Sequence, residues 1–292
     1  MNRGVILALS AYIFWGIHPI YWKWLKHVHS VEIVSHRIFW SFVFFVVILS
    51  LRKNWKGLFD TVRSANNKWI LFGPAFLIGS NWAVYIWAVN AGYIIETSLG
   101  YFICPLISVL LGVIFLHEKL RRVQWIAVSI AALGVFYMTF VYGQFPWISL
   151  YLAVTWGTYG LLRKRSPLGP VQGLLLETAI LSVPALIYIV VLFHTGSCSC
   201  LQDARTSLLL IGTGIISGLP LLVFIAGARL INLSLIGILQ YVYPTMIFLI
   251  GFLMYHEPMD QGKLIGFVSI WIAILLYIIG DIHHRQVHKG ES

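Results

Sequence analysis

The feature that most constrains this chain is a series of ten apolar runs, each about as long as a helix that crosses a bilayer. In lipid, every backbone N–H and C=O must bond within the protein, which only helices and closed barrels achieve. Barrel strands would be about half this length and would alternate in polarity. We therefore predict an all-α polytopic membrane protein with ten transmembrane helices. The runs are 4–22, 33–51, 69–91, 94–116, 124–142, 146–162, 172–193, 206–228, 232–255 and 263–280.

The charged residues support a membrane location and exclude a nucleic-acid partner. Only 10% of the residues are charged, whereas a soluble domain has about a quarter. The net charge of +10 comes from short clusters between the apolar runs, chiefly in 52–68, 119–122 and 163–165, and not from one patch. Clusters on alternate loops follow the positive-inside rule. We therefore expect a multi-pass protein of the bacterial inner (plasma) membrane, surrounded by lipids, with both termini cytoplasmic.

The chain also repeats itself at an offset of 139 residues. Pro105, Gly112, His117 and Glu118 recur as Pro244, Gly251, His256 and Glu257. This spacing predicts two five-helix repeats, 1–143 and 144–282, followed by a cytoplasmic tail, 283–292. An odd number of helices inverts the second repeat, as in many secondary transporters, whose substrate site lies near the midplane between the repeats. Duplication as a way to build a larger bundle is the alternative.

These residues, together with Gln124 and Gly134, resemble the closing pattern of the EamA repeat of the drug/metabolite transporter superfamily. A narrower resemblance, to RarD-type permeases, covers nearly the whole chain. It implies ten spans in two EamA repeats, with export or exchange of small solutes, and it implies no particular substrate. The segments that carry it are His36–Ser41, Asn81–Trp82, Ile86–Asn90, Glu96, Ser98–Phe102, Glu177–Thr178 and Gln240–Tyr241.

Ionisable residues within or next to the apolar runs are candidates for gates, because a lipid-facing charge is costly. From the expected orientation we predict that Arg37 pairs with Glu96 near the outer side, and that Glu177 pairs with Arg229 near the inner side. His36 would add pH sensitivity. The alternative is that these residues form static pairs that stabilise helix packing.

Aromatic and amide residues suggest a binding site. Planar, amphipathic or cationic solutes suit a cavity lined with aromatic faces and a few amides. Pro105 and Pro244 lie within spans, where proline bends a helix, so they are candidate hinges or static bends. The predicted substrate-binding residues are Asn81, Trp82, Tyr85, Tyr101, Gln240 and Tyr241.

Other motifs are missing. The sequence has no phosphate-binding GxxxxGK[ST], no GxSxG and no HExxH, so we predict no enzyme activity, no cofactor and no metal site. The Cys-x-Cys spacing of Cys198 and Cys200 is a poor framework for a structural disulfide.

We predict a secondary transporter that moves a small organic solute (a metabolite, an amino-acid-like compound or a drug) by alternating access. A membrane enzyme acting on lipid-linked substrates and a non-transporting scaffold are the alternatives, and proton coupling and homodimerisation are left open.

Overall fold

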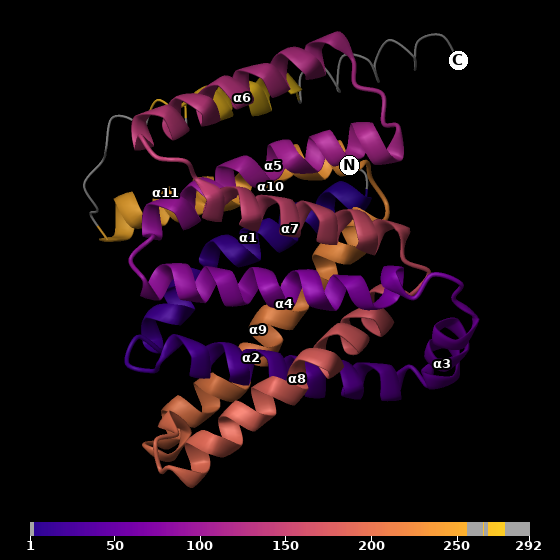
Figure 1. Cartoon of the computed structure of the whole chain (residues 1–292), viewed down its shortest axis with the longest axis vertical. Helices are drawn as coiled ribbons and strands as arrows, with labels where there is room; N and C mark the ends of the chain where they lie inside the picture. Colours follow the sequence, from indigo (N-terminus) through magenta and orange to yellow (C-terminus); the bar gives the residue numbers. More distant parts are fainter. Residues whose placement is uncertain (1–2, 256–264, 266–267, 278–292) are drawn as a thin grey trace.

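The structure, a computed structural model, describes residues 3–255, 265 and 268–277, and every regular element in these residues is a helix (Figure 1). Eight helical stretches are long and apolar enough to cross a membrane. With α7 and the shorter apolar helix Val268–Tyr277 they make up the ten predicted spans, which confirms the predicted fold class. The helices are α1 Arg3–Trp24, α2 Ser30–Leu51, α4 Trp69–Asn90, α5 Ile94–Leu116, α6 Arg122–Tyr142, α7 Trp147–Arg165, α8 Pro170–His194, α9 Ala204–Ala228, and α10 Leu233–Gln240 with α11 Val242–Tyr255.

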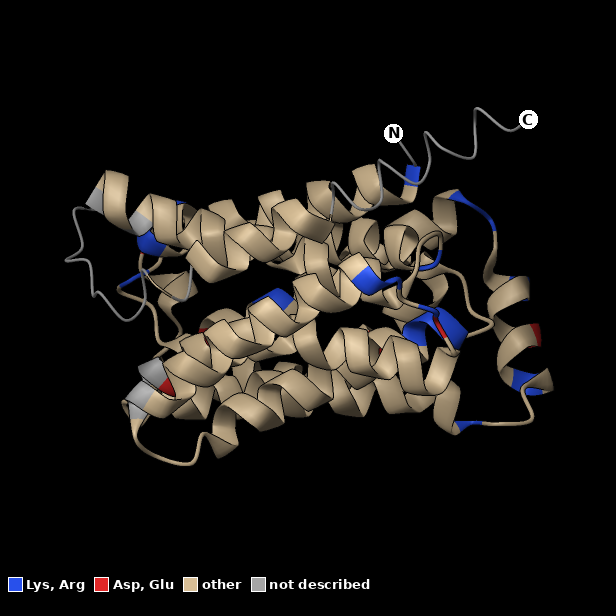
Figure 2. Cartoon of the chain, turned by 90° about the horizontal axis from the view of Figure 1, so that it is seen from above, with Lys and Arg blue, Asp and Glu red and all other residues tan. Residues whose placement is uncertain are grey.

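The helices alternate in direction, and their charged residues gather at one end of the bundle. Figure 2 shows most of the Lys and Arg residues at the end that also carries the start of α1. We call this the basic end, and it includes the connection between α2 and α4, the end of α7 and Arg229. The opposite end holds the end of α1 and the starts of α2 and α5. The predicted tail, 283–292, lies outside the described residues.

The strongest packing joins the two predicted halves. From the first half, α2 packs against α8 and α9, α5 against α7 and α10, and α1 against α9 and α11. Small residues allow the closest approaches: a Cβ at Gly214 would lie 2.4 Å from the backbone carbon of Trp40, and one at Gly237 would lie 2.6 Å from the carbonyl oxygen of Pro105. The halves therefore interlock, while the boundaries 1–143 and 144–282 stay predictions.

Two local features were not predicted from the sequence. The basic segment 52–68 contains a short helix, α3 (Trp55–Ser64), whose Leu58 is buried while Phe59 is exposed. In the loop after α8, Cys198 and Cys200 form a disulfide, so the expectation of no bridge was wrong. The loop folds so that the two Cα atoms lie 5.3 Å apart, which is within the normal range for a disulfide.

The two candidate hinges differ in their local structure. Helix α5 continues through Pro105 without a break. The span formed by α10 and α11 is interrupted at Tyr241, three residues before Pro244. Proline lacks the N–H that would bond the carbonyl of Gln240, which weakens the helix at this point. The hinge role of both residues stays a prediction.

The contact between α2 and α9 predicts the effect of a small substitution. Gly214→Ala places a methyl group against the backbone of Trp40 and should destabilise the protein by about 1–3 kcal/mol, because the helices must separate to make room. Gly160→Ala is the matched control, since its Cβ would lie 3.7 Å from Leu233, an ordinary contact. Thermal unfolding in detergent measures the difference, and equal melting temperatures for the two variants would contradict this packing.

Candidate functional site

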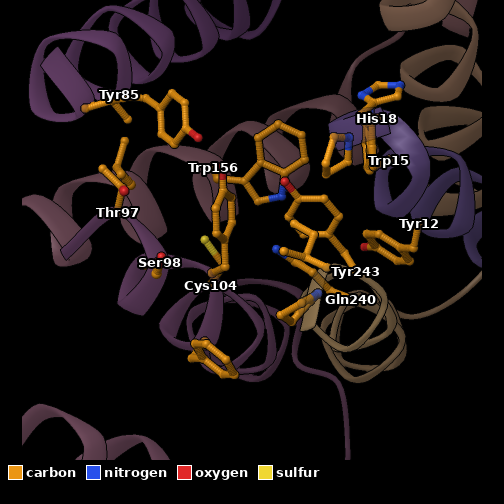
Figure 3. A pocket seen from close by; sticks show the side chains of 18 of the residues that line it. Tyr12, Trp15, His18, Tyr85, Thr97, Ser98, Cys104, Trp156, Gln240 and Tyr243 are labelled. Carbon is orange, nitrogen blue, oxygen red and sulfur yellow. The ribbon is translucent and has the colours of Figure 1, made fainter. Parts of the chain in front are cut away.

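A cavity of about 1110 Å³ lies in the middle of the bundle, between the two predicted halves. Its wall comes from α1, α2, α4, α5 and α6 of the first half and from α7, α9, α10 and α11 of the second. Figure 3 shows aromatic rings on several sides of this space, with Gln240 and Cys104 among them. The cavity extends to Lys23, at the end of α1, and to Thr97, at the start of α5. It therefore reaches toward the end of the bundle opposite the basic end.

Arg37 brings a cation into the cavity wall from α2. Its guanidinium carbon lies 4.2 Å from the centre of a Trp82 ring, which is the geometry of a cation–π contact. Its Nε is buried and has no hydrogen-bond partner. The charge is therefore held against an aromatic face, and the rest of the side chain borders the open space.

Three tyrosines line the cavity close enough to Arg37 to interact with it electrostatically. The ring of Tyr101 lies 5.0 Å from the ring of Tyr243, edge to face, and 6.2 Å from the ring of Tyr85. They come from three helices, α4, α5 and α11, because each is on the face of its helix that turns inward. Their hydroxyl groups can donate hydrogen bonds to a molecule in the cavity.

The two predicted amides lie in the cavity wall and differ in their hydrogen bonds. Asn81 donates from Nδ2 to the carbonyl of Leu152 at 3.0 Å and to the hydroxyl of Thr155 at 2.8 Å, so it joins α4 to α7. Gln240 is buried, and its Oε1 has no partner. The Oγ of Ser217, on α9, is also buried without a partner. Gln240 and Ser217 thus leave polar atoms in the wall that a bound molecule can satisfy.

Five of the six predicted binding residues line the cavity: Asn81, Trp82, Tyr85, Tyr101 and Gln240. Tyr241 is the exception, because it is fully buried and its hydroxyl donates to the carbonyl of Phe102 at 3.3 Å. The interruption between α10 and α11 lies at this residue, and Tyr243 lines the cavity instead. Sequence reasoning also left Tyr12, His18 and Ser217 out of the wall. The one sequence feature that could have pointed to them is that each carries a polar group within a predicted span.

The predicted pair of Arg37 and Glu96 does not form in this conformation. Oε2 of Glu96 accepts a hydrogen bond from the backbone N–H of Ile148 at 3.1 Å, and Ser149 donates to the Glu96 carbonyl at 2.6 Å. The carboxylate therefore lies at the start of α7, where the helix dipole favours a negative charge. Glu96 joins α5 to α7, and its gating role stays a prediction.

At the basic end, Glu177 pairs with Arg163 and not with the predicted Arg229. Nε of Arg163 lies 3.3 Å from Oε1 of Glu177, and both side chains are 2% exposed. The hydroxyl of Tyr159 donates to Oε2 of Glu177 at 3.0 Å. Gly173 leaves the space in which the guanidinium lies. Arg163 was taken from the sequence as part of an exposed basic loop, but α7 extends three residues beyond the predicted span and carries it inside.

Arg229 bonds backbone carbonyls in place of a carboxylate. Its Nη1 donates to the carbonyls of Ser166 at 3.0 Å and Leu168 at 2.5 Å. Lys164 donates similarly to the carbonyls of Ala228 and Ile231. These bonds join the α7–α8 connection to the end of α9. They close the bundle at the basic end, whereas the cavity extends the other way.

His36, next to Arg37 on α2, does not line the cavity. It is buried, neither ring nitrogen has a hydrogen-bond partner, and the sulfur atoms of Cys198 and Cys200 lie within 4.8 Å of a ring nitrogen. Glu32, one turn earlier, accepts hydrogen bonds from the backbone N–H and the hydroxyl of Ser199. The first turns of α2 therefore hold the disulfide loop in place, and the pH-sensing role of His36 stays a prediction.

The ion pair at the basic end can be tested by a double-mutant cycle. Arg163→Met alone leaves the buried Glu177 unpaired and should destabilise the protein by about 3–5 kcal/mol. Glu177→Leu alone should do the same for Arg163. The double variant should be less destabilised than the sum of the two, because no buried charge remains. Thermal unfolding in detergent measures all four proteins, and strictly additive losses would count against the pair.

Comparison with known proteins identifies the family and supports the fold. Residues 2–140 match the EamA-like transporter family. The chain is 43% identical to the uncharacterized transporter YojE of Bacillus subtilis (strain 168), over 99% of this chain and 98% of that one. It is 40% identical to the protein RarD of Escherichia coli (strain K12), over 98% of this chain and 97% of RarD. A chain of known crystal structure shares the fold, with a TM-score of 0.70 and 17% identity, over 94% of this chain and 95% of that one. The chain therefore belongs to the EamA-like transporter family and is of the RarD type.

Proposed function

We propose that this membrane transporter is a secondary transporter that moves a small organic solute across the bacterial inner membrane by alternating access. The observation that carries the proposal is the central cavity, about 1110 Å³ in volume and lined by both halves. Its wall contains buried polar atoms without partners, on Arg37, Ser217 and Gln240. Buried polar groups are normally paired, so such atoms suggest a place for a ligand.

The two ends of the bundle support the idea of alternating access. At the basic end, Arg163 with Glu177 and the carbonyl bonds of Arg229 hold α7, α8 and α9 together. At the opposite end, the cavity extends between α1 and α5. In an alternating cycle the contacts at the closed end must break as the other end closes. Bonds between charged groups suit this role, because water can replace the lost partner when that end opens.

The orientation follows from the charge distribution. From the positive-inside rule we infer that the basic end faces the cytoplasm, and we keep the prediction that both termini lie on that side. In this orientation the cavity extends toward the outside, and we propose that Arg163 and Glu177 form the closed gate on the cytoplasmic side.

The orientation can be tested by labelling in intact cells, with Cys198 and Cys200 replaced by serine. Lys56→Cys, on α3, should resist an impermeant maleimide, because α3 lies at the basic end. Phe145→Cys, in the loop before α7 and 74% exposed, should be labelled. Both positions should react after the cells are made permeable. Labelling of Lys56→Cys from outside would reverse the proposed topology.

Transport is tested with the purified protein in liposomes, by uptake and efflux of a panel of radiolabelled metabolites and drugs. Gln240→Leu removes the unpartnered Oε1 from the wall and should lower transport of any accepted solute roughly tenfold, since a polar contact to the solute is lost. Gln202→Leu makes the same change in an exposed loop and should transport normally. Equal rates for Gln240→Leu and wild type would remove Gln240 from the binding site, and a panel without any transported solute would count against the proposed function.

A further inference from the structure

Arg37 places a positive charge in the cavity wall, and this charge limits the kinds of solute that the cavity can bind. Arg37 contributes a cation whose buried Nε has no hydrogen-bond partner. No Asp or Glu occurs among the described residues that line the cavity. A cleft lined by charges of one sign concentrates ligands of the opposite sign. The cavity therefore disfavours the cationic solutes that its aromatic rings alone would suggest.

Arg37 has no acidic partner in the described part of the chain. Within this part, the one ion pair is that of Arg163 with Glu177, at the basic end. Trp82 offsets some of the cost of placing a cation among apolar helices, but a ring face carries no net charge. A negative charge on a bound molecule would supply the missing counter-ion.

The groups around Arg37 favour a carboxylate. A guanidinium presents its donors in a planar fork that matches the two oxygens of a carboxylate. The hydroxyl of Tyr101 or Tyr243 can donate to the same oxygens, because both rings line the cavity near Arg37. A single guanidinium with neutral hydroxyl groups also balances one negative charge better than two.

The other lining residues indicate the shape and polarity of the part of the solute beyond the carboxylate. The rings of Trp15 and Trp156 lie 5.6 Å apart, nearly perpendicular, and both border the cavity. Such surfaces suit a flat apolar body. Oε1 of Gln240 is an acceptor without a partner, so an uncharged N–H or O–H of the solute would satisfy it. An ammonium group would find no carboxylate among the described lining residues.

We propose that the cavity binds an organic monocarboxylate with a flat apolar body, its carboxylate held by Arg37 and an adjacent tyrosine. Cations and zwitterionic amino acids bind more weakly. The proposal deepens the proposed transport function and rests on it only for the passage of the solute, because binding can be measured without transport.

The test uses one carbon skeleton with different charges. Purified protein in lipid nanodiscs is incubated with radiolabelled 3-phenylpropanoate, and binding is measured by scintillation proximity. Competitors are 3-phenylpropan-1-ol, 3-phenylpropylammonium, L-phenylalanine and phenyl phosphate. We expect 3-phenylpropanoate to bind roughly tenfold or more tightly than the alcohol, the amine and the amino acid. Absence of saturable binding, equal binding of the alcohol, or tighter binding of the amine or of phenyl phosphate would overturn the proposal.

Variants assign the effect to Arg37. Arg37→Gln should abolish the preference for 3-phenylpropanoate over the alcohol, and Arg37→Lys should keep part of it, because the charge stays and the planar fork is lost. Arg63→Gln, on the exposed helix α3, is the matched control and should bind as wild type. If Arg37→Gln does not fold, Tyr101→Phe serves in its place and should weaken carboxylate binding several-fold without affecting the alcohol. Unchanged selectivity in the folded variants would overturn the proposal.

These experiments distinguish a failure of the proposed carboxylate site from a failure of the proposed transport function. Binding of 3-phenylpropanoate that depends on Arg37, without flux in liposomes, would support the binding site and count against transport. Flux of 3-phenylpropylammonium without binding of the carboxylate would support transport and overturn the carboxylate site.

Discussion

The whole structure depends on one constraint: a polar group within the apolar helices must find its partner inside the protein, because lipid offers none. Three glutamates show how the chain meets it. Glu32, Glu96 and Glu118 each accept hydrogen bonds from backbone N–H groups at a helix start, those of η1 (Ser199–Leu201), α7 and α10. At α7 and α10 the carboxylate also meets the positive end of a helix dipole, and each of the three glutamates contacts an element distant from it in sequence. Hydrogen bonds of this charged kind contribute about 1.5–3 kcal/mol.

The motif of Gly112 and Glu118 has a physical reason in this arrangement. Glu118 accepts from the N–H groups of Leu233 and Ser234 and from the Ser234 hydroxyl. A Cβ at Gly112 would lie 2.6 Å from the Glu118 carboxylate, so glycine at this position makes room for the acid. The repeated residues thus hold the start of α10 against the end of α5. Their counterparts His256 and Glu257 lie outside the described residues.

The same constraint distinguishes the ion pair at the basic end from the polar atoms that line the cavity. Glu177 and Arg163 form an ion pair at the basic end, and the hydroxyl of Tyr159 donates a hydrogen bond to Oε2 of Glu177. In the cavity, the polar atoms of Arg37, Ser217 and Gln240 are left without partners. The ion pair joins helices at the basic end, whereas the unpartnered atoms in the cavity are available to bind a solute.

The sequence alone determined the fold class and identified five of the residues that line the cavity. Apolar runs of about twenty residues leave few options but spanning helices, and polar residues inside them must face protein or water. Asn81, Tyr101 and Gln240 were found by this argument. The partners of the charges were not, because depth in the membrane does not say which residues meet. Arg163 reached Glu177 only because α7 continues past the apolar run, and Tyr243 lines the cavity in place of Tyr241 only because the span is interrupted there. Tertiary structure decided these contacts, since helix rotation and the exact end of a helix are set by packing against neighbours.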